Sequence, residues 1–268
     1  MDAPTSIHEL SLLLVEPSAI QAKIIAGQLN KLGVAHVETL PEGGPALTEM
    51  RRQPPDIVLS SMYLPDMTGT DLILAMRADT GLSSLPFILI SSEDRPHILD
   101  PVRQSGVCAI LPKPFSEEQL DSALRTTLDW LNEDESLEQE GLVLDDIRVL
   151  VVDDSPIARK FIRRVLENLG VKHFVEAEDG ADAVKIMEET SVDLVVTDYN
   201  MPEMDGKALT EHIRAQSWQK SVPVLMVTSE TDEGRLAAVH NLGVVGVCDK
   251  PFEPATVKSL LRQLLAES

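Results

Sequence analysis

Short apolar runs alternate along this chain with longer stretches in which apolar and polar residues recur at helical spacing. A short run rich in Val, Ile and Leu that is closed by a turn signal is typical of a buried parallel strand. In the second half the clearest runs are Val149–Ser155, Asp193–Thr197, Val222–Thr228 and Val244–Phe252. Strands that alternate with amphipathic helices predict an α/β fold, with a parallel sheet covered by helices on both faces.

The two halves of the chain repeat each other at a constant offset of 137 residues, without a gap. Matched glycines and prolines carry the argument, because these residues fix turns. The offset places Gly33 on Gly170, Pro65 on Pro202, Gly69 on Gly206, and Lys113-Pro114-Phe115 on Lys250-Pro251-Phe252. The sequence therefore predicts two domains of the same fold in the same register.

In the first half, five strands and five helices are expected to alternate. The predicted strands are Leu12–Val15, His36–Thr39, Ile57–Ser60, Phe87–Ser91 and Ala109–Leu111. The predicted helices are Ser18–Leu32, Gly43–Arg52, Gly69–Ala78, Arg95–Gln104 and Ser116–Leu131. Right-handed crossover connections leave few arrangements open for such a chain.

An acidic segment separates the halves. Residues 133–146 hold seven acidic residues and no Lys or Arg. A run of like charge is typical of a solvated linker, although Glu and Leu also favour helix. The predicted organisation is a first domain at 1–132, a partly helical, exposed linker at 133–146, and a second domain at 147–268.

Charge and targeting signals narrow the function classes. The formal net charge is -21, which disfavours binding to nucleic acid or to an anionic membrane and favours basic partners. The N-terminus lacks a basic segment followed by an apolar one, and no apolar run is long enough to span a bilayer. A cytoplasmic protein is expected.

The predicted strands of the second half end in charged or hydroxyl-bearing residues. In chain order they end in the acid pair Asp153 and Asp154, the acid Asp198, the hydroxyl of Thr228, and Lys250. Ligands bind at the carboxyl edge of a parallel sheet, so these groups are expected to converge there. Three carboxylates repel one another, and a hard divalent cation such as Mg²⁺ resolves that repulsion. Lys250 suits a phosphoryl oxygen.

This constellation resembles the CheY-like receiver domain of bacterial two-component response regulators, from Arg148 to about Leu265. The resemblance implies the flavodoxin-like strand order 2-1-3-4-5 in each domain. It implies that Asp198 accepts a phosphoryl group from phosphohistidine. The implied cofactor is Mg²⁺ or Mn²⁺, held by Asp153, Asp154, Asp198 and the backbone carbonyl of Asn200.

The resemblance also implies the remaining roles and the partners. Thr228 and Lys250 would bind phosphoryl oxygens, while Asn200 and Glu230 would flank the attacking water and tune dephosphorylation. The Lys250–Pro251 bond would be cis. A histidine kinase or phosphotransfer protein would be the donor, and a target protein or a second copy would dock at about 232–264.

The first half departs from this pattern and is expected to be a degenerate receiver, or pseudo-receiver. Its residues at the five site positions are Glu16, Pro17, Ser61, Ser91 and Lys113. A phosphoryl acceptor must be a carboxylate to form an acyl phosphate, and Ser61 is not one. One acid alone lacks the charge to hold Mg²⁺ well. Ser91 and Lys113 are expected to pack or hydrogen-bond locally.

These features predict a response regulator without an output domain of its own. It would signal, as in chemotaxis-like systems, by phosphorylation-dependent protein–protein interaction, and it would carry no separate catalytic domain. Two alternatives stay open: a phosphate sink, and the regulatory receiver pair of a larger enzyme such as a diguanylate cyclase. The latter fails if the chain ends at Ser268. A DNA-binding regulator is disfavoured, because no basic helix-turn-helix segment is visible.

Overall fold

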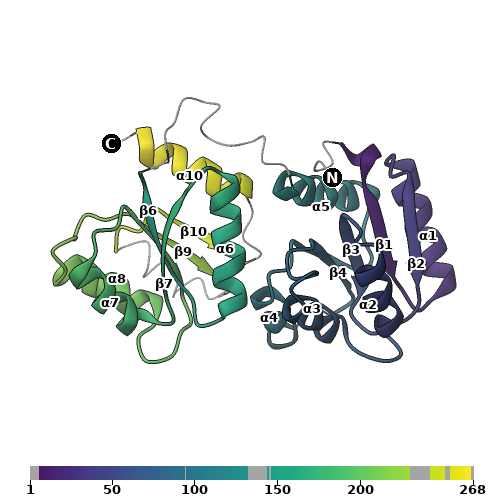
Figure 1. Cartoon of the computed structure of the whole chain (residues 1–268), viewed down its shortest axis with the longest axis horizontal. Helices are drawn as coiled ribbons and strands as arrows, with labels where there is room; N and C mark the ends of the chain where they lie inside the picture. The colour runs from purple at the N-terminus through teal and green to yellow at the C-terminus, as the bar shows by residue number, and fades with distance from the viewer. Residues whose placement is uncertain are drawn as a thin grey trace. The chain divides into compact units, whose positions relative to one another are not determined.

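The chain forms two compact units, Met1–Asn132 and Glu133–Ser268. The structure is a computed structural model that describes residues 6–93, 95–131, 144, 146–229, 242–250 and 254–266. Figure 1 shows that each unit contains a sheet with helices packed around it. Glu230, most of the acidic linker, and residues 232–241 and 251–253 of the expected partner face lie outside the described residues.

The first unit contains one five-stranded parallel sheet in the order β2-β1-β3-β4-β5. This is the predicted 2-1-3-4-5 order, which is confirmed. Its strands are β1 (Ser11–Val15), β2 (His36–Leu40), β3 (Ile57–Ser61), β4 (Phe87–Ser91) and β5 (Ala109–Pro112). Its helices are η1 (Ile7–Glu9), α1 (Ala19–Lys31), α2 (Gly43–Arg52), α3 (Gly69–Ala78), α4 (Pro96–Gln104) and α5 (Glu117–Leu131).

The second unit repeats this arrangement, in the order β10-β9-β8-β6-β7. Read from the other edge, this is again the predicted order. Its strands are β6 (Arg148–Val152), β7 (His173–Ala177), β8 (Leu194–Asp198), β9 (Val224–Thr228) and β10 (Gly246–Asp249). Its described helices are α6 (Pro156–Asn168), α7 (Gly180–Glu189), α8 (Gly206–Ala215) and α10 (Pro254–Ala266).

The central strands of each sheet are buried on both faces, as their near-continuous apolar sequences require. In β1, Leu12 and Leu14 pack into the core layer under α1 and α5. Leu13 and Val15 pack into the opposite layer, with residues of α2 and α3. Successive strand residues point to opposite faces, so one short run fills two cores.

The helix boundaries follow from local capping. The Ser155 side chain accepts a hydrogen bond from the Ala158 amide at the start of α6, and Asp205 does the same for α8. At α3, Thr68 and Asp71 form a reciprocal capping box. Within the described residues, no helix is both long and apolar enough to cross a membrane.

An arginine near the end of the third helix of each unit, α3 or α8, donates hydrogen bonds to backbone carbonyls. Arg77 donates to the carbonyls of Ser83, Leu85, Ser105 and Gly106, at 2.8–3.2 Å. Arg214 donates to those of Lys220, Val222, Leu242 and Gly243, at 2.9–3.3 Å. All ten positions match under the 137-residue offset. Each arginine therefore ties the loop before the fourth strand to the loop before the fifth.

Replacing Arg77 by Ala should lower the free energy of unfolding of the first unit by about 2 kcal/mol or more, because four carbonyls lose a charged donor. Urea unfolding of the full chain measures this. Arg51→Ala is the control: the Arg51 side chain makes an ion pair with Asp79 and is 54% exposed, so its loss should cost about 1 kcal/mol or less. Equal losses of unfolding free energy in the two variants would show that Arg77 does not hold the two loops together.

Candidate functional site

The carboxyl edge of the second sheet brings together the side chains that the sequence singled out. Asp153 directly follows β6, Asp198 is the last residue of β8, and Thr228 is the last residue of β9. Lys250 follows β10, and its amide donates to the Thr228 carbonyl at 2.8 Å. Strands from distant parts of the sequence thus end at one point, because all of them run parallel.

Three carboxylates meet at this edge. Asp153, Asp154 and Asp198 each offer one oxygen, and these oxygens all lie within 4.8 Å of one another. Asp153 and Asp198 are buried, whereas Asp154 is exposed. The cluster is therefore reachable from solvent on the Asp154 side. Its oxygen-only donor set fits a hard divalent cation such as Mg²⁺.

Lys250 supplies a cation inside the cluster. Its ammonium group lies 2.8 Å from Asp153 Oδ2 and 3.0 Å from Asp198 Oδ2, and its side chain is buried. Lys250 was expected to contact a phosphoryl oxygen, and the structure shows that it also pairs with two of the carboxylates. A lysine 97 residues from Asp153 neutralises part of their charge. Three carboxylates against one ammonium still leave negative charge for a bound metal to offset.

Burial sets the electrostatics of Asp153. Removal from water raises the pKa of this carboxyl, the charge of Lys250 lowers it, and the charge of Asp198 raises it again, so that the net shift is upward. The Ser155 amide also donates to Asp153 Oδ1 at 2.8 Å. A second cation near Asp153 would act in the same direction as Lys250 and favour its charged form.

A tight loop holds Asp198. The Tyr199 amide donates to Asp198 Oδ1 at 2.7 Å, and the Thr197 hydroxyl donates to the Asp198 carbonyl at 2.9 Å. Gly206 packs against the same residue: a Cβ there would lie 2.1 Å from the Asp198 carbonyl oxygen. In the first unit, a Cβ on Gly69 would likewise lie 2.8 Å from the Ser61 carbonyl oxygen. This close approach explains why both halves carry glycine there.

Asn200 is the remaining described residue of the predicted site. It is exposed, in the loop after β8. With Tyr199, Met201, Asp205 and Lys207 it lines an open recess of about 580 Å³ beside the acceptor loop. Glu230, its predicted companion in dephosphorylation, falls outside the described residues.

The matching edge of the first unit is closed by its own side chains. The Ser61 hydroxyl donates to Glu16 Oε2. Lys113 Nζ lies 2.9 Å from the same oxygen and 3.2 Å from Ser61 Oγ, and the Ser18 amide donates to Glu16 Oε1 at 2.9 Å. Ser91 Oγ accepts from the Glu93 amide at 2.9 Å. As expected, these residues hydrogen-bond locally.

Two further features of the first site are a missing acid and a cis peptide bond. Pro17 is exposed and has no carboxylate to offer. The Lys113–Pro114 bond is cis, as the resemblance implies for its counterpart, whose Pro251 lies outside the described residues. One carboxylate and one ammonium give this edge no net charge, in contrast to the second unit.

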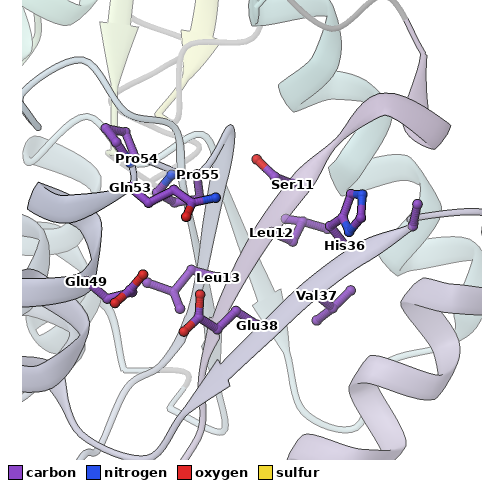
Figure 2. Close-up of a pocket in the computed structure, with 11 residues that line it drawn as sticks. Ser11, Leu12, Leu13, His36, Val37, Glu38, Glu49, Gln53, Pro54 and Pro55 are labelled. Atoms are coloured by element: carbon purple, nitrogen blue, oxygen red, sulfur yellow. The ribbon is translucent and has the colours of Figure 1, made fainter.

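A recess in the first unit lies away from this edge. It measures about 590 Å³ and is lined by the first residues of β1 and β2 and by the end of α2 (Figure 2). Its carboxylates belong to Glu38 and Glu49, and Glu49 is paired with Arg52. Glu16 and Ser61 lie at the opposite ends of their strands, so this recess is separate from the receiver-like site.

Sequence reasoning missed one residue that contacts the backbone of the acidic pair. Arg159, on α6, is 9% exposed, and its Nη1 donates to the Asp153 carbonyl at 2.6 Å. The available signal was a charged residue between the buried positions Ala158 and Ile162 of an amphipathic helix. A charged residue at such a place needs a partner.

Replacing Glu16 by Gln should destabilise the first unit by about 2 kcal/mol at pH 7, because Lys113 and Ser61 lose their charged acceptor. Burial raises the pKa of Glu16, but the hydrogen bonds from Ser61, Lys113 and the Ser18 amide lower it by more. The pKa of Glu16 therefore lies below its ordinary value of 4.5. A lowered pKa contributes stability above the unfolded value, and this stability is lost as pH falls through the folded value.

The difference between the wild type and Glu16→Gln should therefore be full at pH 7 and shrink as pH falls below about 4.5. Urea unfolding at a series of pH values measures it. Glu42→Gln, at an exposed helix-start position, is the control and should differ little from the wild type at pH 7. A pH-independent difference would contradict a charged role for Glu16.

Known families cover both halves of the chain. The response regulator receiver domain profile matches residues 12–125 and 149–262. Chemotaxis protein CheY-3 of Vibrio cholerae serotype O1 is 36% identical over 125 residues, which is 47% of this chain and 96% of that protein. Chemotaxis protein CheY of Pseudomonas aeruginosa is 35% identical over 118 residues, which is 44% of this chain and 95% of that protein.

A similar solved structure also spans one half of the chain. Chemotaxis protein CheY4 of Vibrio cholerae is 33% identical, and the match covers 44% of this chain and 98% of that structure with a TM-score of 0.41. Each of these three proteins is matched over nearly its whole length by less than half of this chain.

Proposed function

This chain belongs to the response regulator receiver domain family and carries two such domains, and we propose that the second accepts a phosphoryl group on Asp198. The donor is a histidine kinase or a phosphotransfer protein. The single observation behind this proposal is the buried Asp198 carboxylate placed between Lys250, at 3.0 Å, and two further acids. The first domain, with Ser61 at the acceptor position, takes no phosphoryl group.

The chemistry is a displacement at phosphorus. A carboxylate oxygen of Asp198 attacks, the bond between phosphorus and the donor nitrogen or oxygen breaks, and the donor leaves with the electron pair. The product is an acyl phosphate. Asp153, Asp154, Asp198 and the Asn200 carbonyl would hold Mg²⁺ or Mn²⁺, which would supply positive charge for the phosphoryl oxygens.

The chain's own residues prepare this step. The Tyr199 amide holds Oδ1 of Asp198, which fixes the carboxylate plane. Lys250 contacts Oδ2 of Asp198, so its ammonium group is close enough to contact a phosphoryl oxygen on that residue. Thr228, at the end of the neighbouring strand, donates a hydrogen bond from its hydroxyl to a second phosphoryl oxygen. Groups fixed in advance stabilise the developing charge without reorganisation.

Phosphorylation would be read by other proteins. The added phosphoryl group carries about −1.5 to −2 charges, which must change the contacts of Lys250 and Thr228. Lys250 directly follows β10 and leads towards α10, so the partner surface is proposed around these elements, within 232–264. The resemblance assigns promotion of hydrolysis, which ends the signal, to Asn200 and Glu230.

Asp198→Asn should abolish phosphoryl uptake, because an amide cannot form an acyl phosphate. Incubation with acetyl phosphate and Mg²⁺ followed by intact-mass measurement should show one added phosphoryl group on the wild type and none on this variant. Ser61→Ala is the matched control in the first domain and should still gain one group. Stoichiometric labelling of Asp198→Asn would reject the acceptor.

Ser61→Asp alone should not restore a site in the first domain. The new carboxylate would face Glu16 and Lys113, but Pro17 leaves the cluster without its second metal-binding acid and fixes the backbone there. Adding Pro17→Asp to Ser61→Asp should give more uptake, because it restores that acid.

The measurement is a mass count in an Asp198→Asn background, so that only the first domain can respond. The double variant Ser61→Asp, Pro17→Asp is compared with Ser61→Asp alone. One added phosphoryl group on Ser61→Asp alone would show that the first pocket lacks only its acceptor.

A further inference from the structure

A buried arginine contacts the backbone of the acidic pair Asp153 and Asp154. Arg159 donates from Nη1 to the carbonyl oxygen of Asp153 at 2.6 Å. The other side of Asp153 is held as well, since its amide donates to the Ala177 carbonyl at 3.3 Å. The backbone at the end of β6 is therefore fixed on both sides of the first metal-binding acid.

Arg159 is itself held by acids on and beside β7. Its Nε lies 3.2 Å from Glu176 Oε2, and its Nη2 lies 3.9 Å from Glu178 Oε1. Arg163 shares Glu176, at 3.6 Å, but no hydrogen bond joins Arg163 to Asp153 among those the structure describes. Part of the charge of Arg159 is thus offset locally, and its hydrogen bond to the Asp153 carbonyl restrains the backbone there.

The first domain provides an internal comparison. There the strand end has the same backbone path: the Glu16 amide donates to the Leu40 carbonyl at 3.0 Å, as Asp153 does to Ala177. The residue at the Arg159 position is Ala22, which has no side-chain donor, and the Glu176 position is Thr39. The arginine support is present where the acid pair is present and missing where it is lost.

We infer that Arg159 is a positioning residue for the metal site, an inference that rests on the proposed function. The Asp153 carbonyl and the Asp154 amide belong to one planar peptide unit. Holding that oxygen therefore also holds the Asp154 backbone, which directs the exposed Asp154 carboxylate towards Asp153 and Asp198. Asp154 is the least buried of the three acids, so it gains most from this restraint.

Two effects of removing Arg159 oppose each other. Loss of a positive charge near the acids would strengthen cation binding, whereas loss of the hydrogen bond would let the Asp153–Asp154 peptide turn and weaken it. Because Glu176 and Glu178 already offset part of the charge, we expect the orientation effect to dominate. Outer partners that orient metal ligands are typically worth about tenfold or more in affinity.

The test is a calorimetric titration of the full, unphosphorylated chain with Mg²⁺ alone. Arg159→Met removes the donors and keeps the length of the side chain, and it should weaken Mg²⁺ binding about tenfold. Arg163→Met is the matched control: it lies one turn away, contacts the same Glu176, and should leave the affinity near that of the wild type. Unchanged or tighter binding by Arg159→Met overturns the inference.

A second variant covers the case in which Arg159→Met does not fold. Arg159→Lys keeps the charge, but a single ammonium cannot reproduce the planar fork that spans the Asp153 carbonyl and Glu176. Its Mg²⁺ affinity should fall between those of the wild type and Arg159→Met. Wild-type affinity in Arg159→Lys overturns the inference.

Phosphoryl uptake from acetyl phosphate gives an independent readout. For Arg159→Met, the Mg²⁺ concentration at half-maximal rate should rise about tenfold, while the rate at saturating Mg²⁺ stays near that of the wild type. A lower maximal rate with an unchanged Mg²⁺ requirement overturns positioning of the metal site. If the wild type itself neither binds Mg²⁺ nor takes up a phosphoryl group, the proposed function fails first.

Discussion

The buried charge at the carboxyl edge of the second sheet is the constraint that the rest of that unit serves. Asp153 and Asp198 are removed from water, which is costly for ionised carboxylates unless a cation is close. Lys250 meets both, within 3.0 Å. The three side chains come from the ends of β6, β8 and β10, so only a parallel sheet that aligns those ends can satisfy the charges.

The first unit shows that this fold does not depend on an acidic pocket. Its sheet has the same strand order, yet its edge holds a neutral set in which Ser61 and Lys113 share one oxygen of Glu16. The charge of Glu16 is balanced by Lys113 of the same unit, without a bound metal ion. The scaffold and the charge cluster are therefore separable, and the repeated glycines and prolines belong to the scaffold.

Much of this could be predicted from sequence, because the signals were local or repeated. Apolar runs gave the strands, and matched turn residues such as Gly69 and Gly206 gave the second domain. Predicted and observed helix ends differ by at most one residue in the first unit, for example at α2 and α3. The site residues could be placed together because parallel strands end at one edge.

The arginines could not be predicted in the same way. Arg77 and Arg214 bind backbone carbonyls, and Arg159 binds the Asp153 carbonyl. A carbonyl is present at every residue, so its use leaves no mark in the sequence of the acceptor. Lys250 was recognised as a phosphoryl ligand, but its pairing with Asp153 depends on burial, which composition does not reveal.

The two edges also differ in how they can respond to added charge. Lys250 is shared between two carboxylates, so its ammonium has alternative partners of similar distance and can be redistributed when a phosphoryl group brings further negative charge. Among the described residues, Lys113 pairs with one carboxylate, that of Glu16, which the Ser61 hydroxyl and the Ser18 amide also contact. A neutral, satisfied cluster offers nothing to redistribute. The two edges thus differ in charge balance, and under the proposed function only the second has a cation that a phosphoryl group could redistribute.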